Sequence, residues 1–284
     1  MNLVVQLQKL GVTLVRILPL KISDKIATVL GLIFCYLSKK KRSYIQKNLQ
    51  YIFADTEIAP RHLNYYLKRT FINFARMTVD FFRLGSIATQ ELVSSVELIG
   101  GENLNKALER KTGCVLMTLH LGNWDYAGSY LAALGIPMSA LVEATNHEMF
   151  VLYTKHRERT GMKTFPLDRA GYAFLQTIKN NRVLAVLADR DILKNGVTVK
   201  FFSGKRNIPK GLAEIIINKH IPVVFAYLAF NQPERKARYL GVVEAPIFFN
   251  GAVQDFNRFM VNKFEQIIRC YPDQWLVFHP EWLE

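Results

Sequence analysis

Residues 115–125 constrain the fold more than any other stretch, because an apolar run ends abruptly there in a histidine, a glycine and a carboxylate. Residues 114–119 are mostly apolar, follow the turn residues Lys111, Thr112 and Gly113, and are too few for an ordinary helix, so we predict a buried strand. His120 then lies at the carboxyl end of this strand. In open α/β sheets ligands bind at that edge, because the loops that leave the strands separate there.

The spacing of His120 and Asp125 predicts a turn between them. Residues five apart on a regular helix point about 140° away from each other, so these side chains cannot share a helix face. Gly122 can adopt backbone angles that are closed to other residues, which lets the chain bend Asp125 back toward the ring. A carboxylate on one ring nitrogen would leave the other nitrogen as a base near neutral pH. The alternative is a half-buried histidine that serves the fold, with Asp125 as a helix cap.

Strands and helices alternate from residue 96 onward, without repeats or low-complexity linkers. We predict strands at 96–99, 114–119, 138–142, 163–167, 183–188, 197–202, 221–230 and 238–247, and helices at 61–84, 103–109, 125–134, 148–160, 172–179, 212–219 and 253–270. The alternation predicts an α/β fold, a single domain with a mostly parallel or mixed central sheet flanked by helices. The aromatic segment at 275–279 has no clear role.

Residues 1–60 are predicted to form a helical segment that precedes the main domain at 61–284. Apolar residues at positions 3, 7, 10, 14 and 17 predict an amphipathic helix that ends before Pro19. Ser23 or Asp24 can cap a second helix, whose apolar run at 26–37 spans about 18 Å, too short for a bilayer core of about 30 Å. Four cations follow at 39–42, which suits a segment that lies in the headgroup region of an anionic membrane. The alternative is an ordinary core helix followed by a solvated basic turn.

The charge balance indicates a polyanionic partner. The 284 residues include 37 Lys and Arg against 23 Asp and Glu, a net charge of +14, which suits either nucleic acid or an anionic membrane. Cys35, Cys114 and Cys270 are too far apart to predict a disulfide framework or a metal site. Motifs for an acyl-serine hydrolase, a zinc centre and a dinucleotide site are absent from the sequence. We therefore predict no metal and no bound cofactor.

Acidic residues follow the predicted strand at 183–188. The tripeptide Asp189-Arg190-Asp191 begins directly after it. If this strand is parallel to the one that precedes His120, the carboxylates and the histidine share one edge of the sheet. Each acid is then a further candidate partner for the imidazole. The alternative is a pair of solvated loop charges.

Residues 204–211 are predicted to form a basic turn that leads into a helix. Lys205 and Arg206 lie in it between two glycines. Exposed amides at the start of a helix and nearby cations can bind phosphate. Lys205 and Arg206 are therefore candidate substrate-binding residues.

The segment His120-Leu-Gly-Asn-Trp-Asp125 resembles the His-x4-Asp/Glu signature of the lipid A biosynthesis acyltransferases and the related phosphatidylinositol mannoside acyltransferases. Similar residues recur in order along the chain: Arg42 with Asn48-Leu49, Arg157 with Gly161, Ala188-Asp-Arg-Asp191, Gly196-Val-x-Val-x-Phe-Phe-x-Gly204 and Pro209-x-Gly-x-Ala213. Each block is weak alone, but together they are fairly specific. Asp125 stands where many lipid A enzymes carry Glu, and Ala188-Asp-Arg-Asp191 where they tend to carry Asp-Gln-Asp. Both departures look more like the mannoside-acylating branch.

The resemblance implies a fold like that of the glycerol-phosphate acyltransferases and an acyltransferase domain at 61–284. The donor is then a thioester of acyl carrier protein or coenzyme A, and the acceptor a membrane glycolipid. His120 would take the proton of the attacking hydroxyl, while Asp125, Asp189 or Asp191 steadies the imidazolium. The amides of residues 121–123, including that of Asn123, are the nearest donors for the oxyanion.

Further substrate-binding candidates lie at the end of the predicted strand at 138–142 and at the end of the helix that follows it. Glu143 follows the predicted strand at 138–142, and Arg157 and Arg159 lie on the last turns of the following helix. The resemblance implies that Glu143 and Arg157 lie near the acceptor, where a guanidinium suits a lipid phosphate. Arg159 and Arg190 complete the predicted set. The alternative is a structural pairing of Glu143 with Arg157 or Arg159.

These expectations place the chain on the cytoplasmic face of the bacterial inner membrane, as a peripheral or monotopic protein. Its expected partners are an anionic membrane surface, a glycolipid acceptor and an acyl-carrier-protein or coenzyme A thioester, with no nucleic acid. The alternatives are a lysophospholipid-type acyltransferase, a basic nucleic-acid-binding protein, and a membrane-attached protein without catalysis.

Overall fold

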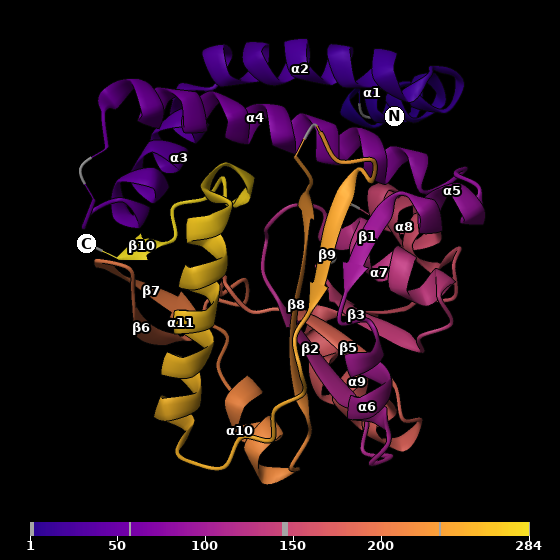
Figure 1. The fold of residues 1–284 in the computed structure, drawn as a ribbon, viewed down its shortest axis with the longest axis vertical. Coiled ribbons are helices and arrows are strands. Elements are labelled where there is room, and N and C mark those ends of the chain that lie inside the picture. Colours follow the sequence, from indigo (N-terminus) through magenta and orange to yellow (C-terminus); the bar gives the residue numbers. More distant parts are fainter. Residues whose placement is uncertain (1–2, 57, 144–146, 233, 284) are drawn as a thin grey trace.

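The computed structural model describes residues 3–56, 58–143, 147–232 and 234–283. These residues form the α-helices α1 Leu3–Ile17, α2 Leu20–Leu37, α3 Lys39–Ile52, α4 Pro60–Arg83, α5 Thr89–Ser94, α6 Glu102–Leu108, α7 Trp124–Ala133, α8 His147–Glu158, α9 Ala170–Lys179, α10 Leu212–Asn218 and α11 Val253–Cys270. They also form the strands β1 Val96–Ile99, β2 Cys114–Thr118, β3 Met138–Val142, β4 Lys163–Pro166, β5 Val183–Leu187, β6 Val197–Phe201, β7 Gly204–Ile208, β8 Val223–Phe230, β9 Tyr239–Val243 and β10 Trp282–Leu283. The predicted alternation from residue 96 onward is confirmed (Figure 1).

A seven-stranded sheet with the order β1-β9-β8-β2-β5-β3-β4 forms the centre of the domain. Each neighbouring pair is parallel except β8 and β9, which are antiparallel. The predicted α/β domain with a mixed, mostly parallel central sheet is therefore confirmed. Strands β2 and β5 pair in register, Cys114 with Val183 and Thr118 with Leu187, so the residues that follow these two strands emerge side by side.

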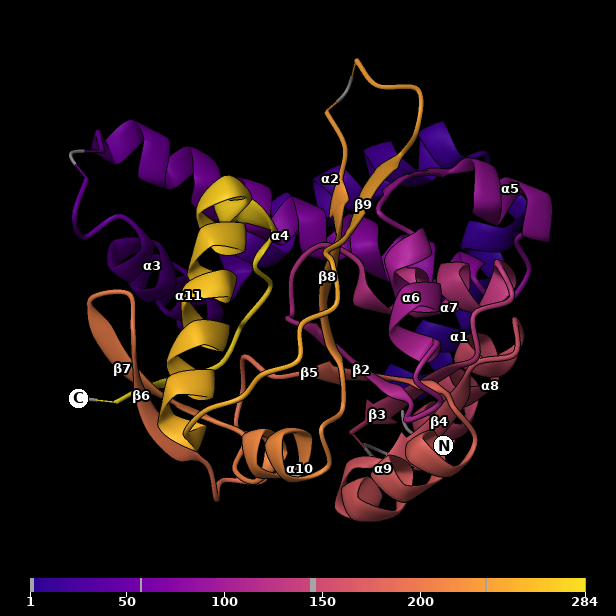
Figure 2. The ribbon, with the colours of Figure 1, turned by 60° about the horizontal axis from the view of Figure 1, so that its bottom comes forward.

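Helix α7 covers one face of this sheet. It contacts β3 and β8, and the ring of Tyr126 on α7 lies 4.9 Å from the ring of Tyr239 on β9. Because side chains alternate along a strand, neighbouring residues of β8 serve opposite faces, and Phe225 packs against Phe259 and Phe264 of α11. Figure 2 shows α11 and the strands β6 and β7 on one side of β8 and the helices α6–α9 on the other.

A small antiparallel sheet with the order β10-β7-β6 corrects one prediction. Residues 204–208 are strand β7 and not a turn, although α10 follows them as expected. In β7 the side chains of Arg206 and Ile208 are buried while that of Lys205 is exposed. This is strand periodicity, but a buried cation among polar residues and glycines concealed it in the sequence.

Helix α2 packs along α4 through a face of small residues. Its buried positions are Ser23, Ala27, Gly31 and Cys35, one per turn. A Cβ at Gly31 would lie 2.8 Å from the backbone of α4, so only glycine permits this approach. The prediction that Ser23 or Asp24 caps the helix is wrong: α2 begins at Leu20, directly after Pro19, and contains both residues.

Most of the large apolar side chains of α2 consequently point away from the protein, whereas Phe34 packs against Phe71 and Phe278. Figure 1 shows α2 as the outermost layer beyond α4. Its exposed apolar residues, together called the α2 outer face, are Ile22, Ile26, Val29, Leu30, Leu32, Ile33, Tyr36 and Leu37. Within the described part of the chain, no helix has the length and apolarity to span a membrane.

The cations after α2 are divided between solvent and the protein. Lys39 and Lys40 are exposed at the start of α3. Arg42 donates to the carbonyls of Cys35 and Tyr36, both at 2.9 Å, and so binds the carboxyl end of α2. Lys41 donates through Nζ to the Phe278 carbonyl at 2.9 Å. Two of the four charges therefore have partners in the fold.

A buried ionic network ties α2 and α4 to the sheet. Arg238 donates to both Asp24 carboxylate oxygens at 2.7 Å and, through Nε, to Asp80 Oδ2 at 2.7 Å. The Tyr239 hydroxyl donates to the same Asp80 oxygen. Burial opposes the charge of Asp24, but Arg238 and Arg76 outweigh it, so the pKa of Asp24 is lowered. The network fixes the start of β9 against the helices α2 and α4.

Candidate active site

His120 and Asp189 form the polar centre of the site. His120 follows β2 and Asp189 follows β5, and the parallel register of these neighbouring strands brings the two residues together. His120 Nδ1 lies 2.7 Å from Asp189 Oδ1, and the His120 amide donates to both carboxylate oxygens at 3.2 Å. Among the three acids that the sequence offered as partners for the imidazole, Asp189 is the one in contact with it.

Asp189 is fully buried and ionised. Burial alone would raise its pKa, but His120, the Trp275 indole N–H and the charge of Arg206 outweigh burial and lower the pKa to about 2. Trp275 Nε1 donates to Asp189 Oδ2 at 2.8 Å. Because an ionised carboxylate only accepts, Nδ1 carries the proton of the His120–Asp189 bond. The Nε2 nitrogen, which has no hydrogen-bond partner among the described residues, is then the basic one.

The turn after His120 is held by backbone hydrogen bonds. Gly122 has a φ of +62°, and a Cβ there would lie 1.9 Å from the Leu228 carbonyl oxygen, so only glycine fits. The amides of Leu121, Gly122 and Asn123 donate to the carbonyls of Leu119, Gln274 and Leu228 at 2.7–2.9 Å. Their predicted role as oxyanion donors is therefore wrong, because each already has an acceptor.

Asn123 is a structural residue and not part of the substrate site. Its side chain is fully buried. Its Oδ1 accepts from the Tyr126 amide at 3.1 Å, which caps α7, and its Nδ2 donates to the Tyr239 hydroxyl at 2.9 Å. Both ends of the amide are occupied, which corrects the prediction that Asn123 binds substrate.

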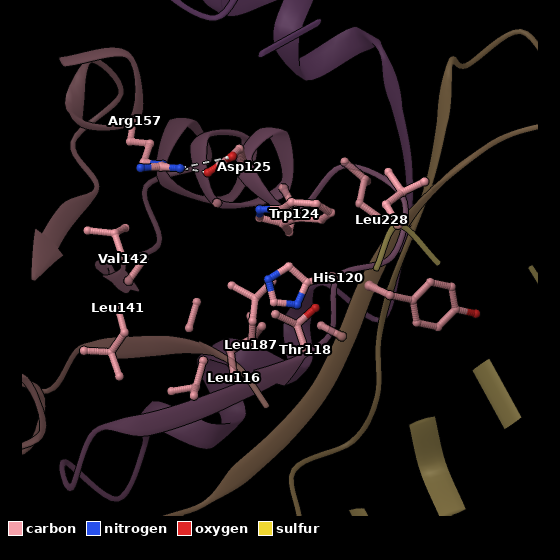
Figure 3. A pocket seen from close by; sticks show the side chains of 18 of the residues that line it. Leu116, Thr118, His120, Trp124, Asp125, Leu141, Val142, Arg157, Leu187 and Leu228 are labelled. Atoms are coloured by element: carbon pink, nitrogen blue, oxygen red, sulfur yellow. Dashed lines mark hydrogen bonds and ion pairs between the residues drawn. The ribbon is translucent and has the colours of Figure 1, made fainter. Parts of the chain in front are cut away.

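Asp125 pairs with Arg157 and not with His120. Arg157 donates through Nε to Asp125 Oδ1 at 2.6 Å and through NH2 to Oδ2 at 3.2 Å, a bidentate pair. Figure 3 shows the Trp124 ring between this pair and His120, and the Trp124 and His120 ring centroids are 5.0 Å apart. The first turn of α7 carries Asp125 away from the imidazole. The predicted structural pairing of Arg157 with Glu143 is not the one observed.

A cavity of about 430 Å³ extends from His120 between α7 and the sheet. Its floor comes from small or apolar residues on one face of neighbouring strands: Ala140 on β3, Ala185 on β5, Leu116 on β2, Ala226 on β8 and Gly241 on β9. Ala185 and Leu187 remain partly exposed although β5 lies inside the sheet, because the cavity leaves their side chains uncovered. Figure 3 shows the apolar walls below the His120 ring.

Polar residues gather at one part of the cavity. Glu143 and Arg190 line it, together with Lys41 and His279. Arg190 donates through Nε to Glu281 Oε1 at 2.7 Å. Burial lowers the pKa of His279, and Arg190 and Lys41 lower it further. Glu143 and Arg190 therefore both line the cavity, and Arg190 is already paired to a carboxylate.

The remaining predicted site residues lie elsewhere. Asp191 accepts from the amides of Asn195 and Gly196, at 3.3 and 2.8 Å, and so closes its own loop. Arg159 donates to the carbonyls of Leu84, at 2.8 Å, and Ile87 after the end of α4. Neither residue lines the cavity. Both side chains are instead bound to backbone groups close to them.

Lys205 and Arg206 also lack the predicted phosphate-binding geometry. Lys205 is exposed on β7, and neither residue lines the cavity. Arg206 is fully buried, and its guanidinium carbon lies 4.7 Å from the Trp275 ring centroid and 5.0 Å from that of Trp282. Burial lowers the pKa of Arg206 to about 10, although Asp189 and Glu281 oppose this shift. The cation therefore belongs to the interior behind Asp189.

Trp275 is the residue that sequence reasoning missed. It lies in the aromatic segment to which no role was given, more than 80 positions from the acid that it contacts. The only signal was chemical, because a buried indole N–H needs an acceptor. Lys41 and His279 were likewise not predicted to line the cavity.

The sequence model of the family described as bacterial lipid A biosynthesis acyltransferase matches residues 3–284. The chain belongs to this family. It is 28% identical over 218 residues to the phosphatidylinositol mannoside acyltransferase of Mycobacterium tuberculosis, covering 74% of this chain and 68% of that protein. It is 24% identical over 270 residues to a lipid A biosynthesis acyltransferase of Haemophilus influenzae, covering 93% of this chain and 82% of that protein. The predicted family is confirmed, and the family is one of acyltransferases that modify lipid acceptors.

A third relative is also a phosphatidylinositol mannoside acyltransferase and has a similar level of identity to this chain. The phosphatidylinositol mannoside acyltransferase of Mycolicibacterium smegmatis is 25% identical over 222 residues, which cover 76% of this chain and 72% of the relative. His120, Asp125 and Asp189 all lie within the part of this acyltransferase that the family model matches.

Proposed function

We propose that this acyltransferase moves a fatty acyl group from a thioester of acyl carrier protein or coenzyme A to a hydroxyl of a membrane glycolipid. The observation that supports this most is the His120–Asp189 pair beside a long apolar cavity. Membership of a lipid-acylating family supports the same reaction class. The test is a purified assay with an acyl thioester and a phosphatidylinositol mannoside or lipid A precursor, read by mass spectrometry. Thioester consumption without an acylated lipid product would contradict the proposal.

His120 acts as general base in this proposal. Nε2 removes the proton from the acceptor hydroxyl as its oxygen attacks the thioester carbonyl, and Asp189 stabilises the imidazolium that forms. The carbon–sulfur bond then breaks and the thiolate leaves, which it does readily because thiol pKa values lie near ~8.5. The thiolate takes up the proton from the imidazolium, which returns His120 to its basic form. With the amides of 121–123 occupied, the first two amides of α7, at Trp124 and Asp125, are our candidate oxyanion donors, because they lack acceptors within the helix.

The apolar cavity is the proposed site of the acyl chain. A sheet interior normally packs without voids, so a floor of Ala140, Ala185, Ala226 and Gly241 is costly unless a ligand fills the space. The polar end at Glu143, Arg190 and His279 would then face the acceptor headgroup. Arg157 itself lines the cavity and stays a candidate for binding the phosphate of the acceptor, although Asp125 already occupies its fork.

Replacing Ala185 with leucine is expected to shorten the acyl chain that the enzyme accepts. The added methyl groups enter the cavity from the middle of its floor, and each methylene they exclude forfeits about 0.8 kcal/mol, roughly a fourfold loss in kcat/KM. A series of donors from short to long measures the effect, with long chains losing at least tenfold and short chains unchanged. Ala185→Ser, which is close to alanine in size, is the control. Equal losses at all lengths would contradict the acyl site.

The α2 outer face is the proposed membrane contact, together with the exposed Lys39 and Lys40. Eight large apolar side chains on one exposed helix face form a patch that water does not favour, and cations beside it suit an anionic leaflet. Residues 1–60 are then the membrane-associating segment. We propose the cytoplasmic face of the inner membrane, because acyl thioesters are made in the cytoplasm.

The triple replacement Ile26→Ser, Val29→Ser and Ile33→Ser is expected to weaken binding to anionic vesicles at least tenfold. All three side chains are exposed, so folding is preserved, and each loses part of the ~1.5–3 kcal/mol that burial in the membrane would contribute. Cosedimentation measures the change. Tyr172→Ser with Leu175→Ser, on the exposed face of α9, is the control. Unchanged sedimentation of the triple variant would place the contact elsewhere.

A further inference from the structure

The segment Gln274–Trp275–Leu276, here called the clamp segment, contacts both members of the His120–Asp189 pair. The Leu276 amide donates to the His120 carbonyl at 2.7 Å, and the Gln274 carbonyl accepts from the Gly122 amide at 2.8 Å. Between these two bonds, the Trp275 indole donates to Asp189 Oδ2 at 2.8 Å. Three consecutive residues therefore bind the histidine's backbone, its turn and its acid.

We propose that the clamp segment holds His120 and Asp189 in their working geometry and that Trp275 is a positioning residue for the Asp189 carboxylate. This inference rests on the proposed function. Asp189 Oδ2 is taken by the indole, which leaves Oδ1 for the imidazole at 2.7 Å. Rotation of the Asp189 carboxylate would break its bonds to the indole and to the imidazole. The indole therefore holds the carboxylate plane in the orientation that lets Oδ1 bind His120 Nδ1.

The clamp segment is itself held by packing and by hydrogen bonds. Trp275 is 2% exposed, and its ring lies parallel to that of Phe201, with centroids 5.8 Å apart and 3° between the planes. The Gln274 side chain accepts from the Phe230 amide at 2.7 Å and donates to the Phe230 carbonyl at 3.1 Å, which anchors it to β8. A donor held on two sides can impose an orientation on its acceptor.

Arg206 completes the arrangement behind Trp275. Its guanidinium rests on the ring faces of Trp275, Phe201 and Trp282 and makes no hydrogen bond among the described residues. It lies 4.0 Å from Glu281. A buried cation at this position favours the ionised form of Asp189. Arg206 donates no hydrogen bond to the Asp189 carboxylate. Besides the longer bonds from the His120 amide, the indole is thus the donor that holds the orientation of the carboxylate.

Trp275→Phe tests the proposal against a matched control, Trp282→Phe. Trp282 lies in the same aromatic cluster and also donates through its indole, to Asn48 Oδ1 at 2.7 Å, but it does not contact Asp189. Both variants lose a buried ring and a hydrogen bond. We expect kcat to fall about 10- to 100-fold in Trp275→Phe alone, with the KM of both substrates unchanged, because a charge-assisted hydrogen bond is lost. Equal kcat losses in the two variants would overturn the proposal.

A double-mutant cycle separates positioning from general damage. In an Asp189→Asn background the Trp275→Phe change should cost little further kcat, because the orientation it secures no longer matters. Additive losses would mean that Trp275 acts through the fold. Replacement of Trp275 by benzothienylalanine, which keeps both rings but has no N–H, covers the case in which the phenylalanine variant does not fold, and the same kcat loss is expected.

A spectrum of the free protein tests the clamp segment without any turnover. With ¹⁵N-labelled histidine, the Nδ1 proton of His120 should resonate far downfield in the parent and in Trp282→Phe and move in Trp275→Phe. An unmoved signal in Trp275→Phe would overturn the positioning role. A parent protein that shows this signal but turns over no thioester would contradict the proposed function and leave the clamp geometry intact.

Discussion

Replacing His120 with alanine is expected to lower kcat by about 10²- to 10⁴-fold, the usual worth of general-base assistance. Nε2 faces the cavity without a hydrogen-bond partner among the described residues, and the 13% exposed side chain needs no change of fold to be removed. Purified protein is assayed with saturating donor and acceptor. Donor affinity and the unfolding midpoint should change little, because the acyl cavity and the sheet remain.

The control for this variant is the other cavity histidine. His279→Ala removes an imidazole from the same cavity, but one that has no hydrogen bond to a carboxylate among the described residues, and it should retain more activity than His120→Ala. A His120→Ala protein that keeps more than a tenth of the parent rate would exclude general-base catalysis. That residual difference amounts to only about 1.4 kcal/mol of barrier.

Asp189→Asn is expected to cause the second large loss, about 10²- to 10⁴-fold in kcat with little change in KM. Asparagine keeps the size but can donate to Nδ1, which favours the wrong tautomer, and it cannot stabilise an imidazolium by charge. Asp125→Asn is the matched control, since it also removes one carboxylate from the same region but contacts Arg157 instead. A larger kcat loss in Asp125→Asn than in Asp189→Asn would overturn the assigned pair.

Asp189→Asn should also weaken the dependence of the free energy of unfolding on pH in the acid range. The folded pKa of Asp189 is about 2 against an ordinary value of 3.8, so its ionised form contributes stability that is present above pH ~4 and lost as pH falls toward about 2. Chemical unfolding at pH 7 and at pH 3 measures this. The parent should lose more stability than Asp189→Asn over that interval, and an equal loss would mean that another acid dominates.

The local pattern of the chain was enough to predict the main elements and the strand edge of the site. Strand β3 and helix α11 have the predicted bounds. A strongly apolar run or a long helical repeat of apolar residues fits one kind of secondary structure much better than the other. Strand β7 was missed because its inward position holds Arg206, and polar strands carry no hydrophobic signal. The start of α2 was misplaced because its buried face consists of small residues, which a hydrophobic period does not mark.

The partners of the side chains were decided by tertiary structure. The spacing of His120 and Asp125 left a local pair open, but α7 starts at Trp124 and turns Asp125 toward Arg157. Asp189 reaches His120 because β5 pairs with β2 in parallel, a contact between residues 69 positions apart. No local preference encodes which strands become neighbours, so sequence reasoning could only state the pair as a consequence of parallel strands.

By itself the sequence determined that a histidine closes a buried strand in an α/β domain, that acids end another strand, and that an apolar, basic segment opens the chain. These follow from short-range chemistry, namely side-chain polarity, backbone freedom at glycine and the periods of helix and strand. Only the tertiary structure decided that Asp189 is the acid beside His120, that the Trp275 indole donates to it, and that α2 turns most of its large apolar side chains outward. Those outcomes depend on which surfaces pack together, and packing sums contacts between segments far apart in the chain.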